Sequence, residues 1–381
     1  MISQKLPIGI LGDGQLALML GEAALAQGVD FLAYGNDPHS SFATRFPSQF
    51  RLGKKNDQKT LNEFARSCSA LTLENEFYKV NQLREVAQAT GVPFFPDLPS
   101  YQFFESKVSQ HRFFDRLGIP SPRWSPYTPE AVQTFSYPLV LKASEGGYDG
   151  YGVRIVQFEE GLAQALSDLG YSEGRPVLIE EKVNIEREFA QGVLLDGTGG
   201  IIFLPLVETI QKNGICEMVL SRSSLSLQEY KKVESTIHVI LKKFASTQMR
   251  GLFNFEFFYV NGEVLINEGA PRVHNSQHLT LNASPVSQFD LVMNYLWAGK
   301  MEPKEVTILP AIMVNLLGKS KGEQYRLALP VLPPEIQVHA KLYLKKECRP
   351  GRKMGHLNLV DPSGKFNLIE LAERVLKEYE L

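Results

Sequence analysis

The residues best suited to chemistry lie in one short stretch, 267–280, which reads Asn-Glu-Gly-Ala-Pro-Arg-Val-His-Asn-Ser-Gln-His-Leu-Thr. A carboxylate (Glu268), a guanidinium group (Arg272), an imidazole (His274) and an amide (Asn275) lie within a span of eight residues. They directly follow an apolar run that is typical of a strand. Because a strand end holds side chains firmly and leaves them accessible, the pattern favours a binding or catalytic site over a polar loop with an incidental Glu–Arg pair.

A second acid lies in an unusually apolar segment. Glu256 is the only charged residue in the run Leu-Phe-Asn-Phe-Glu-Phe-Phe-Tyr-Val. A lone buried carboxylate is costly and needs a partner. Residues 252–268 are typical of a β-hairpin around Asn261-Gly262, in which Glu256 and Glu268 would face each other. Such a pair could bind Mg²⁺, which prefers carboxylates together with substrate phosphates; a salt bridge to Arg or Lys is the alternative.

A metal site shared by Glu256 and Glu268 is possible only in one register of the hairpin. A two-residue turn with a regular ladder would pair Glu256 with Asn267 and send Glu268 to the other face of the sheet. A shared metal site needs Glu256 opposite Glu268. The sequence therefore predicts either a three-residue loop, 261–263, or a β-bulge.

Three further patterns could bind nucleotides. The glycine-rich segment 145–152 lies between two strand-like runs, and its backbone N–H groups could bind phosphates, with Lys142 adding a point charge. A plain hairpin tip is the alternative. Glu180 and Glu188 could hold an adenine amino group or ribose hydroxyls, although isolated acids are more often solvated. The segment Gly12-x-Gly14-x-x-Ala17 resembles a weak dinucleotide fingerprint, which could equally receive another phosphate or make a tight turn.

The elements that position these residues alternate between strands and helices. This alternation predicts an α/β protein with a parallel, Rossmann-like sheet at its N-terminus. Prolines near residue 100 mark the exit from that layer. We predict an N-terminal domain over residues 1–99 and a central domain over 100–300. A small C-terminal lobe over 301–381 should open with proline-rich strands and end in an amphipathic helix.

The composition excludes several classes of protein. Hydrophobic residues make up 44% and charged residues 22% of the 381, as in an ordinary globular protein. A net charge of −2 gives no electrostatic case for binding nucleic acid or a membrane surface. The longest nearly apolar run, 16–26, contains Glu22 and is too short to span a bilayer. Three widely separated cysteines suit a reducing compartment, so we expect a cytoplasmic protein.

Taken together, the motifs resemble the ATP-grasp superfamily and, more closely, the 5-(carboxyamino)imidazole ribonucleotide synthetases. The resemblance covers nearly the whole chain. It rests on these segments: Gly12-x-Gly14-Gln15-Leu16, Thr72-x-Glu74-x-Glu76, Gly146-Gly-Tyr-Asp-Gly-x-Gly152, Asn267-Glu-x-Ala-Pro-Arg-x-His-Asn-Ser276, Ser287-Gln288-Phe289 and Arg349-Pro-Gly-Arg-Lys-Met-Gly-His-Leu-Asn358. The fourth and the last are highly specific.

The resemblance implies a role for each matching residue. ATP would be bound by Lys107, Lys142, Gly147, Gly150, Glu180, Val183, Glu188 and Asn267. Mg²⁺, or Mn²⁺ in its place, would be held by Glu256 and Glu268. Bicarbonate and the carboxyphosphate made from it would be held by the catalytic residues Arg272, His274 and Asn275. Aminoimidazole ribonucleotide would be bound by Gly14, Gln15, Glu76, Tyr148, Lys345 and Arg352. The resemblance also implies a homodimer.

Three positions depart from the family pattern. Tyr151 replaces a basic residue, Val153 replaces a glutamine and Leu18 replaces an arginine. These departures leave open a related ATP-grasp carboxylate–amine ligase with another acceptor, or a nucleotide-binding protein that has lost turnover. Intact Glu256, Glu268 and Arg272 argue against lost turnover.

The departure at position 151 generates a prediction. A tyrosine hydroxyl gives one neutral hydrogen bond to a phosphate, where arginine gives a charge-assisted and often bidentate contact. Tyr151→Arg should therefore lower the KM for aminoimidazole ribonucleotide by about five- to thirtyfold (~1–2 kcal/mol) and leave the KM for ATP nearly unchanged in steady-state assays. Complete loss of activity would show instead that this tyrosine has its own role.

Overall fold

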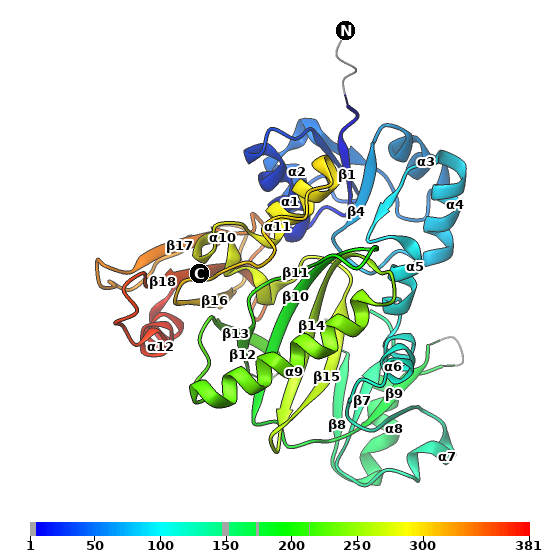
Figure 1. The fold of residues 1–381 in the computed structure, drawn as a ribbon, viewed down its shortest axis with the longest axis vertical. Coiled ribbons are helices and arrows are strands. Elements are labelled where there is room, and N and C mark those ends of the chain that lie inside the picture. Colours follow the sequence, from blue (N-terminus) through cyan, green and yellow to red (C-terminus); the bar gives the residue numbers. More distant parts are fainter. Residues whose placement is uncertain (1–4, 147–151, 173–174, 213) are drawn as a thin grey trace.

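The computed structural model describes residues 5–146, 152–172, 175–212 and 214–381. They form three β-sheets with helices packed around them (Figure 1). The N-terminal segment makes one sheet at the top of Figure 1, and two antiparallel sheets lie below it.

The first sheet has five parallel strands in the order β3-β2-β1-β4-β5. Its strands are β1 (Ile8–Leu11), β2 (Phe31–Gly35), β3 (Phe50–Leu52), β4 (Ala70–Leu73) and β5 (Phe94–Phe95). Its helices are α1 (Gln15–Ala26), α2 (Ser41–Arg45), α3 (Gln58–Arg66) and α4 (Val80–Thr90), followed by the short α5 (Leu98–Tyr101). The strand order reverses between β1 and β4, and a crevice for ligands opens at such a point in parallel sheets. The expected α/β class and Rossmann-like sheet are confirmed.

A second, smaller sheet has four antiparallel strands in the order β6-β9-β7-β8. They are β6 (Trp124–Pro126), β7 (Leu139–Ala143), β8 (Val153–Val156) and β9 (Val177–Glu181). The helix α6 (Lys107–Arg116) leads into this sheet, and α7 (Pro129–Val132) and α8 (Leu162–Asp168) lie beside it. Leu139 and Leu141 pack into an apolar cluster that includes residues of α8. Because side chains alternate along a strand, Lys142 lies on the opposite face.

The third sheet has nine strands and joins the middle of the chain to its C-terminal segment. Eight strands follow the order β15-β14-β10-β12-β13-β16-β18-β17, and β11 pairs with β10. Their bounds are β10 (Arg187–Asp196), β11 (Ile201–Phe203), β12 (Val207–Lys212), β13 (Ile215–Leu220), β14 (Arg250–Val260), β15 (Glu263–Ala270), β16 (Ala311–Leu317), β17 (Gln337–Leu342) and β18 (Lys353–Val360).

The long helix α9 (Leu227–Ala245) covers one face of this sheet (Figure 1). Phe253, Phe255 and Phe257 of β14 share an apolar cluster with five buried residues of α9. Because strand residues alternate between faces, Asn254 and Glu256 lie on the face that looks away from α9. The apolar strand therefore buries its aromatic residues on one side and presents its single acid on the other.

The hairpin β14–β15 contains the β-bulge that a shared metal site requires. Val260 pairs with Glu263, so the turn is the two-residue Asn261-Gly262, and both residues have positive φ (50° and 79°). The register shifts after Glu256, which makes Glu256 the partner of Glu268 and leaves Asn267 as the extra residue. The predicted bulge is confirmed, and the loop is not three residues long.

The C-terminal segment continues the third sheet through β16 to β18 and ends in α12 (Leu368–Glu378). Strands were expected from residue 301, but the first begins only at Ala311, because prolines 303 and 310 interrupt the chain before it. Before this segment, α10 (Thr280–Ala283) and α11 (Gln288–Ala298) connect the sheets, and α11 packs against α1. The domain limits near residues 99 and 300 stay predictions.

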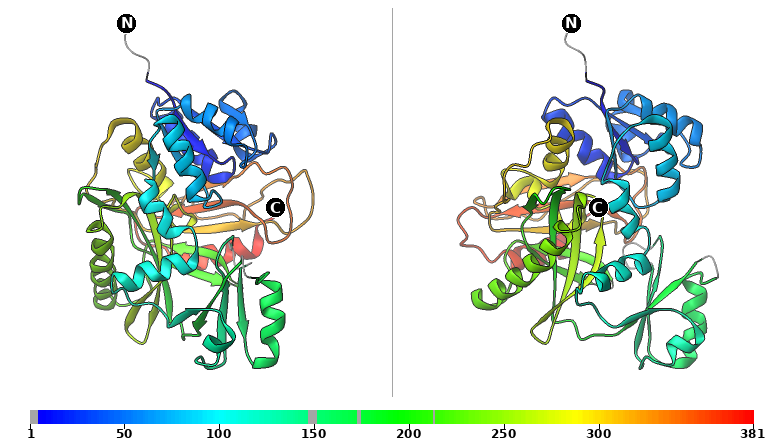
Figure 2. Two further views of the ribbon diagram at one scale, coloured as in Figure 1. Left: turned by 90° about the vertical axis from the view of Figure 1, so that its right-hand side faces the viewer. Right: turned by 45° about the vertical axis from the view of Figure 1, so that its right-hand side comes forward.

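Figure 2 shows the N-terminal layer above the third sheet, with the four-stranded sheet projecting below. In the described ranges, no helix combines the length and the apolar character that crossing a membrane requires.

The packing of β14 on α9 gives a stability prediction. Phe255 is fully buried and stacks on Phe244 with ring centroids 4.3 Å apart. Phe255→Ala should destabilise the protein by about 3–5 kcal/mol, because it leaves a cavity between sheet and helix. Val239→Ala, at a 57% exposed position of the same helix, should change stability by less than about 0.5 kcal/mol. Equal denaturant midpoints for the two variants would contradict this packing.

Candidate functional site

The Glu256 face of the third sheet meets the Lys142 face of the four-stranded sheet. The Lys142 Nζ atom lies 2.6 Å from Glu180 Oε2 and donates a 2.8 Å hydrogen bond to Asn267 Oδ1. The same Nζ atom lies 6.0 Å from the ring centroid of Phe258. Lys142 therefore bridges the two sheets, and the bulged residue Asn267 is its partner on the larger one.

The helix α6 supplies a second set of contacts between the sheets. Lys107 forms an ion pair with Glu268. Gln110 accepts a 3.0 Å hydrogen bond from the backbone N–H of Gly269, and His111 Nε2 lies 3.1 Å from Glu180 Oε1. Positions 107, 110 and 111 share one face of a helix. One helical face thus contacts both the bulged hairpin and the end of β9.

The carboxylates of the cluster differ in their electrostatics. Burial raises the pKa of Glu268, but the adjacent Lys107 outweighs burial and holds it at about 2. Burial, together with the negative charges of Glu268 and Glu188, raises the pKa of Glu256 to about 8. Burial likewise raises the pKa of Glu188 to about 7, with Glu268 contributing. The acids therefore repel one another, and an added cation would relieve the repulsion.

The cluster fits a metal ion that is shared with a substrate. Over the described residues, no group of three or more His, Cys, Asp and Glu side chains is placed to hold a metal on its own. Two facing carboxylates, Glu256 and Glu268, are what Mg²⁺ uses when phosphate oxygens and water supply its other ligands. The donors present thus suit Mg²⁺ bound together with a phosphate-bearing substrate.

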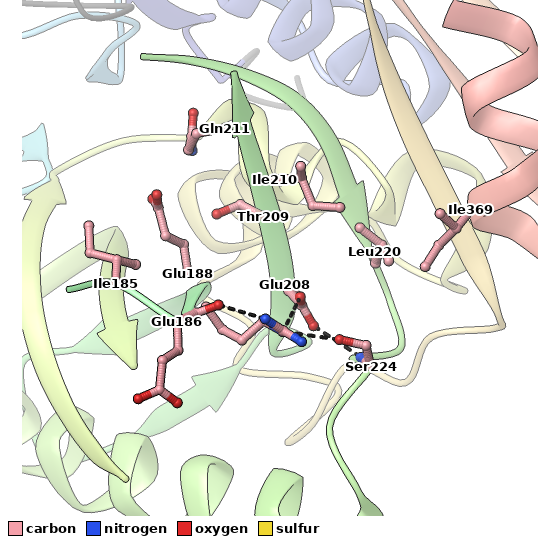
Figure 3. Close-up of a pocket in the computed structure, with 11 residues that line it drawn as sticks. Ile185, Glu186, Glu188, Glu208, Thr209, Ile210, Gln211, Leu220, Ser224 and Ile369 are labelled. Atoms are coloured by element: carbon pink, nitrogen blue, oxygen red, sulfur yellow. Dashed lines mark hydrogen bonds and ion pairs between the residues drawn. The ribbon is translucent and has the colours of Figure 1, made fainter. Parts of the chain in front are cut away.

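A pocket of about 400 Å³ is lined by residues of β10, β12 and β13, Glu188 among them (Figure 3). Glu188 and Gln211 line its upper part, and a hydrogen bond from Gln211 lowers the pKa of Glu188. Below them, Glu208 forms an ion pair with Arg187 (3.3 Å) and accepts a hydrogen bond from the backbone N–H of Ser224 (3.1 Å). The charged groups of the lower wall therefore pair with one another. Glu188 faces the pocket, and no described basic side chain lies within ion-pair distance of it.

Arg272 and His274 lie at the other end of the site. Arg272 Nε is 2.9 Å from Glu76 Oε1, so the arginine connects β15 to the loop after β4. His274 Nε2 is 3.8 Å from Glu256 Oε1. Gln288 is fully buried and holds the backbone of His274 at both groups: its Oε1 accepts from the N–H (2.8 Å) and its Nε2 donates to the C=O (2.7 Å). The backbone of His274 is thus held in place, and its imidazole lies beside Glu256.

Asn275 lies next to this group but its amide is engaged. Its Nδ2 donates to Asn315 Oδ1 (3.0 Å), and Asn315 Nδ2 donates back to Asn275 Oδ1 (2.8 Å). Asn315 belongs to β16 and is fully buried. This reciprocal pair joins the site loop to the C-terminal segment, and a direct contact of Asn275 with a substrate stays a prediction.

Two of the residues expected to bind a ribonucleotide lie at the start of α1, and two others lie in a loop whose preceding strand contacts this helix. Gly14 and Gln15 begin this helix, and Lys345 and Arg352 lie in the loop between β17 and β18. The Lys341–Glu22 ion pair and the burial of Tyr343 in the cluster of α1 place that loop's strand against the helix. Leu18 is fully buried there, so the departure at this position serves packing. The carboxylate of Glu74 fills the N-terminus of α1, which argues against a dinucleotide site.

Some expected residues are placed and others are not. Val183 lies between β9 and β10 and is half-buried. Gly147, Tyr148, Gly150 and Tyr151 lie outside the described residues. Several buried polar residues support the site residues. The sequence placed Glu74 and Gln288 in motifs but gave them no role, and it missed Gln110, His111 and Asn315. The spacing of positions 107, 110 and 111 could have shown that these residues share one face of a helix. No sequence pattern could have shown the partners of Gln288 and Asn315, which come from other segments of the chain.

Comparisons with known proteins cover all parts of the fold. The ribonucleotide synthetase preATP-grasp domain matches residues 6–102, the ATP-grasp domain residues 112–289 and the phosphoribosylaminoimidazole carboxylase C-terminal domain residues 311–365. The N5-carboxyaminoimidazole ribonucleotide synthase of Synechococcus elongatus is 31% identical over 361 residues, with 92% of this chain and 89% of that protein covered.

Two solved structures share the fold. The carboxyaminoimidazole ribonucleotide synthase of Aspergillus clavatus, complexed with ATP, matches with a TM-score of 0.82 at 25% identity over 97% of this chain and 99% of that one. The N5-carboxyaminoimidazole ribonucleotide synthetase of Thermus thermophilus matches with a TM-score of 0.81 at 29% identity over 97% and 98%.

The two hydrogen bonds by which Gln288 holds the backbone of His274, called the Gln288 clamp below, can be tested without any ligand. Gln288→Leu keeps the side-chain volume but leaves the buried N–H and C=O of His274 without partners, at about 1–3 kcal/mol for each group. We expect a clear loss of stability in chemical denaturation. Gln228→Leu, in the exposed first turn of α9, is the matched control and should stay within about 0.5 kcal/mol of the parent. A stable Gln288→Leu protein would exclude the Gln288 clamp.

Proposed function

Because this chain belongs to the family of N5-carboxyaminoimidazole ribonucleotide synthases, we propose that it joins bicarbonate to the amino group of aminoimidazole ribonucleotide. The resemblance inferred from the motifs is confirmed, and the chain is an ATP-grasp ligase. The reaction consumes ATP, releases ADP and phosphate, and serves purine biosynthesis. The observation that carries the proposal is the facing pair Glu256–Glu268, with Lys107 and Lys142 beside it and Arg272 at its end.

We place ATP where the two antiparallel sheets meet, beside Lys107 and Lys142. The Aspergillus clavatus relative was solved in complex with ATP. In this chain, Lys107 and Lys142 would release part of their present contacts and pair with phosphates, as compact cations do. Glu180, whose carboxylate already bridges Lys142 and His111, orients the lysine. Glu188, Gln211 and the pocket beside them suit the ribose hydroxyls.

The bound metal would be held by Glu256 and Glu268. Bound between these carboxylates and the phosphates, Mg²⁺ would supply positive charge that offsets the phosphate charge. Mn²⁺ would satisfy the same oxygen ligands. The raised pKa of Glu256 and the proximity of three acids support the proposal, because a cation at this point removes their repulsion.

Bicarbonate is activated before it meets the amine. An oxygen of bicarbonate attacks the γ-phosphorus of ATP, and ADP leaves with the electrons of the broken P–O bond. The resulting carboxyphosphate breaks its C–O bond to give CO₂ and phosphate. The amino group then attacks the carbon of CO₂ and loses a proton. Arg272, held by Glu76, would bind the anionic oxygens, and His274 would contact the same group from the metal side.

The protein's contribution is positioning and charge neutralisation, with no covalent step on a side chain. Gly14, Gln15, Glu76, Tyr148, Lys345 and Arg352 are the proposed contacts of the ribonucleotide. A homodimer and a cytoplasmic location remain predictions.

The proposed reaction predicts how ATP hydrolysis responds to each substrate. Phosphate release should require Mg²⁺ and bicarbonate. It should rise on addition of aminoimidazole ribonucleotide, because capture of CO₂ by the amine favours breakdown of carboxyphosphate over its return to ATP and bicarbonate. A coupled phosphate-release assay with each component omitted in turn measures this. Stimulation by another amine acceptor, and none by this ribonucleotide, would assign the chain to a related ligase.

Removing one carboxylate of the pair should be severe. Glu256→Gln or Glu268→Gln should lower kcat by more than about a hundredfold, which is ~2.7 kcal/mol or more of barrier, because the clamp on the transferring phosphate loses a charged ligand. Glu373→Gln, at an exposed position of α12, is the matched control and should keep the parental rate. Near-parental turnover in either site variant would exclude the shared-metal assignment.

A further inference from the structure

A carboxylate of the chain itself occupies the start of α1. Glu74, in the loop directly after β4, accepts hydrogen bonds at Oε1 from the backbone N–H groups of Asp13 (3.1 Å) and Gly14 (2.7 Å). Its Oε2 accepts from the N–H of Ala17 (2.8 Å). The side chain is nearly buried, with 9% of the residue exposed. Glu74 therefore satisfies three backbone donors at a helix N-terminus, where such donors lack partners within the helix.

The glycines of the turn are shaped around this carboxylate. A Cβ added to Gly12 would lie 2.1 Å from Glu74 Cγ, and one added to Gly14 would lie 2.9 Å from Oε1. Gly12 also has a φ of +126°, which other residues rarely adopt. In a dinucleotide fingerprint such glycines let the backbone approach a pyrophosphate. In this chain they let it approach Glu74.

The surroundings of Glu74 leave its pKa above the ordinary value and offset only part of the effect of burial. Burial raises the pKa of Glu74, while the N–H groups of Ala17 and Gly14 and the charge of Arg272 lower it. Two residues later in the chain, Glu76 forms the ion pair with Arg272. The segment after β4 thus contacts the α1 turn through Glu74 and the proposed bicarbonate residue through Glu76.

We propose that Glu74 is a positioning residue for the ribonucleotide: it acts as an internal anion that holds the α1 turn in the shape presenting Gly14 and Gln15. This rests on the proposed function. A second consequence is specificity. Because the anion-binding end of α1 is filled, the substrate's phosphate binds to the basic side chains of other segments, and phosphate-rich dinucleotides are refused.

The first test is a comparison of kinetic constants. Glu74→Gln keeps the shape but replaces one oxygen that accepts backbone hydrogen bonds with an amide that donates, so the turn should be displaced. We expect the KM for aminoimidazole ribonucleotide to rise by about tenfold or more, and the KM for ATP and the bicarbonate-dependent ATPase without ribonucleotide to stay within about twofold. Glu63→Gln, an exposed acid on α3 of the same layer, is the matched control and should match the parent.

The second test uses chemical rescue. Glu74→Ala removes a –CH₂–COO⁻ group, which is the size of acetate. Added acetate should lower the KM for the ribonucleotide in this variant and raise its Tm, whereas butyrate, which is too large, and chloride at equal ionic strength should not. In the parent protein, acetate should change neither the KM for the ribonucleotide nor the Tm. A role in packing alone would not be restored selectively by one small carboxylate.

Each failure has its own signature. An unchanged KM for the ribonucleotide in folded Glu74→Gln would overturn the proposal. So would the absence of any acetate effect on folded Glu74→Ala. If Glu74→Ala does not fold, the kinetic constants of Glu74→Gln decide the question. If the parent itself shows no stimulation by ribonucleotide, the proposed function fails, and the acetate-dependent Tm of Glu74→Ala still decides whether a carboxylate at this turn is what holds it.

Discussion

Because Asn267 is the extra residue of a β-bulge, Glu256 and Glu268 lie opposite each other on the sheet face that looks away from α9. A regular ladder through the Asn261-Gly262 turn would have sent Glu268 to the aromatic face, where α9 packs. The bulged residue is itself used, since Asn267 accepts a hydrogen bond from Lys142 of the four-stranded sheet. The relative placement of the two carboxylates therefore depends on this single register shift, and the bulged residue adds a contact to the facing sheet.

The cluster built on the bulge is held together by contacts that a nucleotide can replace. Lys107 and Lys142 pair with Glu268 and Glu180 in the protein alone, which neutralises part of the buried negative charge. Glu256 and Glu188 remain electrostatically strained, as their raised pKa values of about 8 and 7 indicate. A metal ion and phosphates together would give the acids a cation and the lysines an anion. The pattern of charge thus suits joint binding of the two better than either alone.

The acceptor half of the site depends on contacts between segments that are far apart in the sequence. Arg272 pairs with Glu76, Gln288 holds the backbone of His274, and Asn315 pairs with the amide of Asn275. Each contact joins the loop after β15 to a different part of the chain: the first sheet, α11 and β16 respectively. Burial makes these polar contacts costly to break, so they hold the loop in one arrangement.

The amino-acid sequence by itself determined the chemistry and much of its position. The parallel first sheet, the isolated acid in an aromatic strand and the need for a bulge all followed from side-chain periodicity, which acts over a few residues. The sequence likewise predicted that the acidic, basic and amide groups around the end of β15 form a site. Tertiary structure alone decided what those groups touch. The glycines before α1 resembled a nucleotide fingerprint, yet Glu74 fills the helix end that a nucleotide would have used. Asn275 looked free for substrate, yet its amide pairs with Asn315, forty residues further along. Such partners are chosen by the packing of distant segments, and local sequence patterns carry no information about which distant groups will meet.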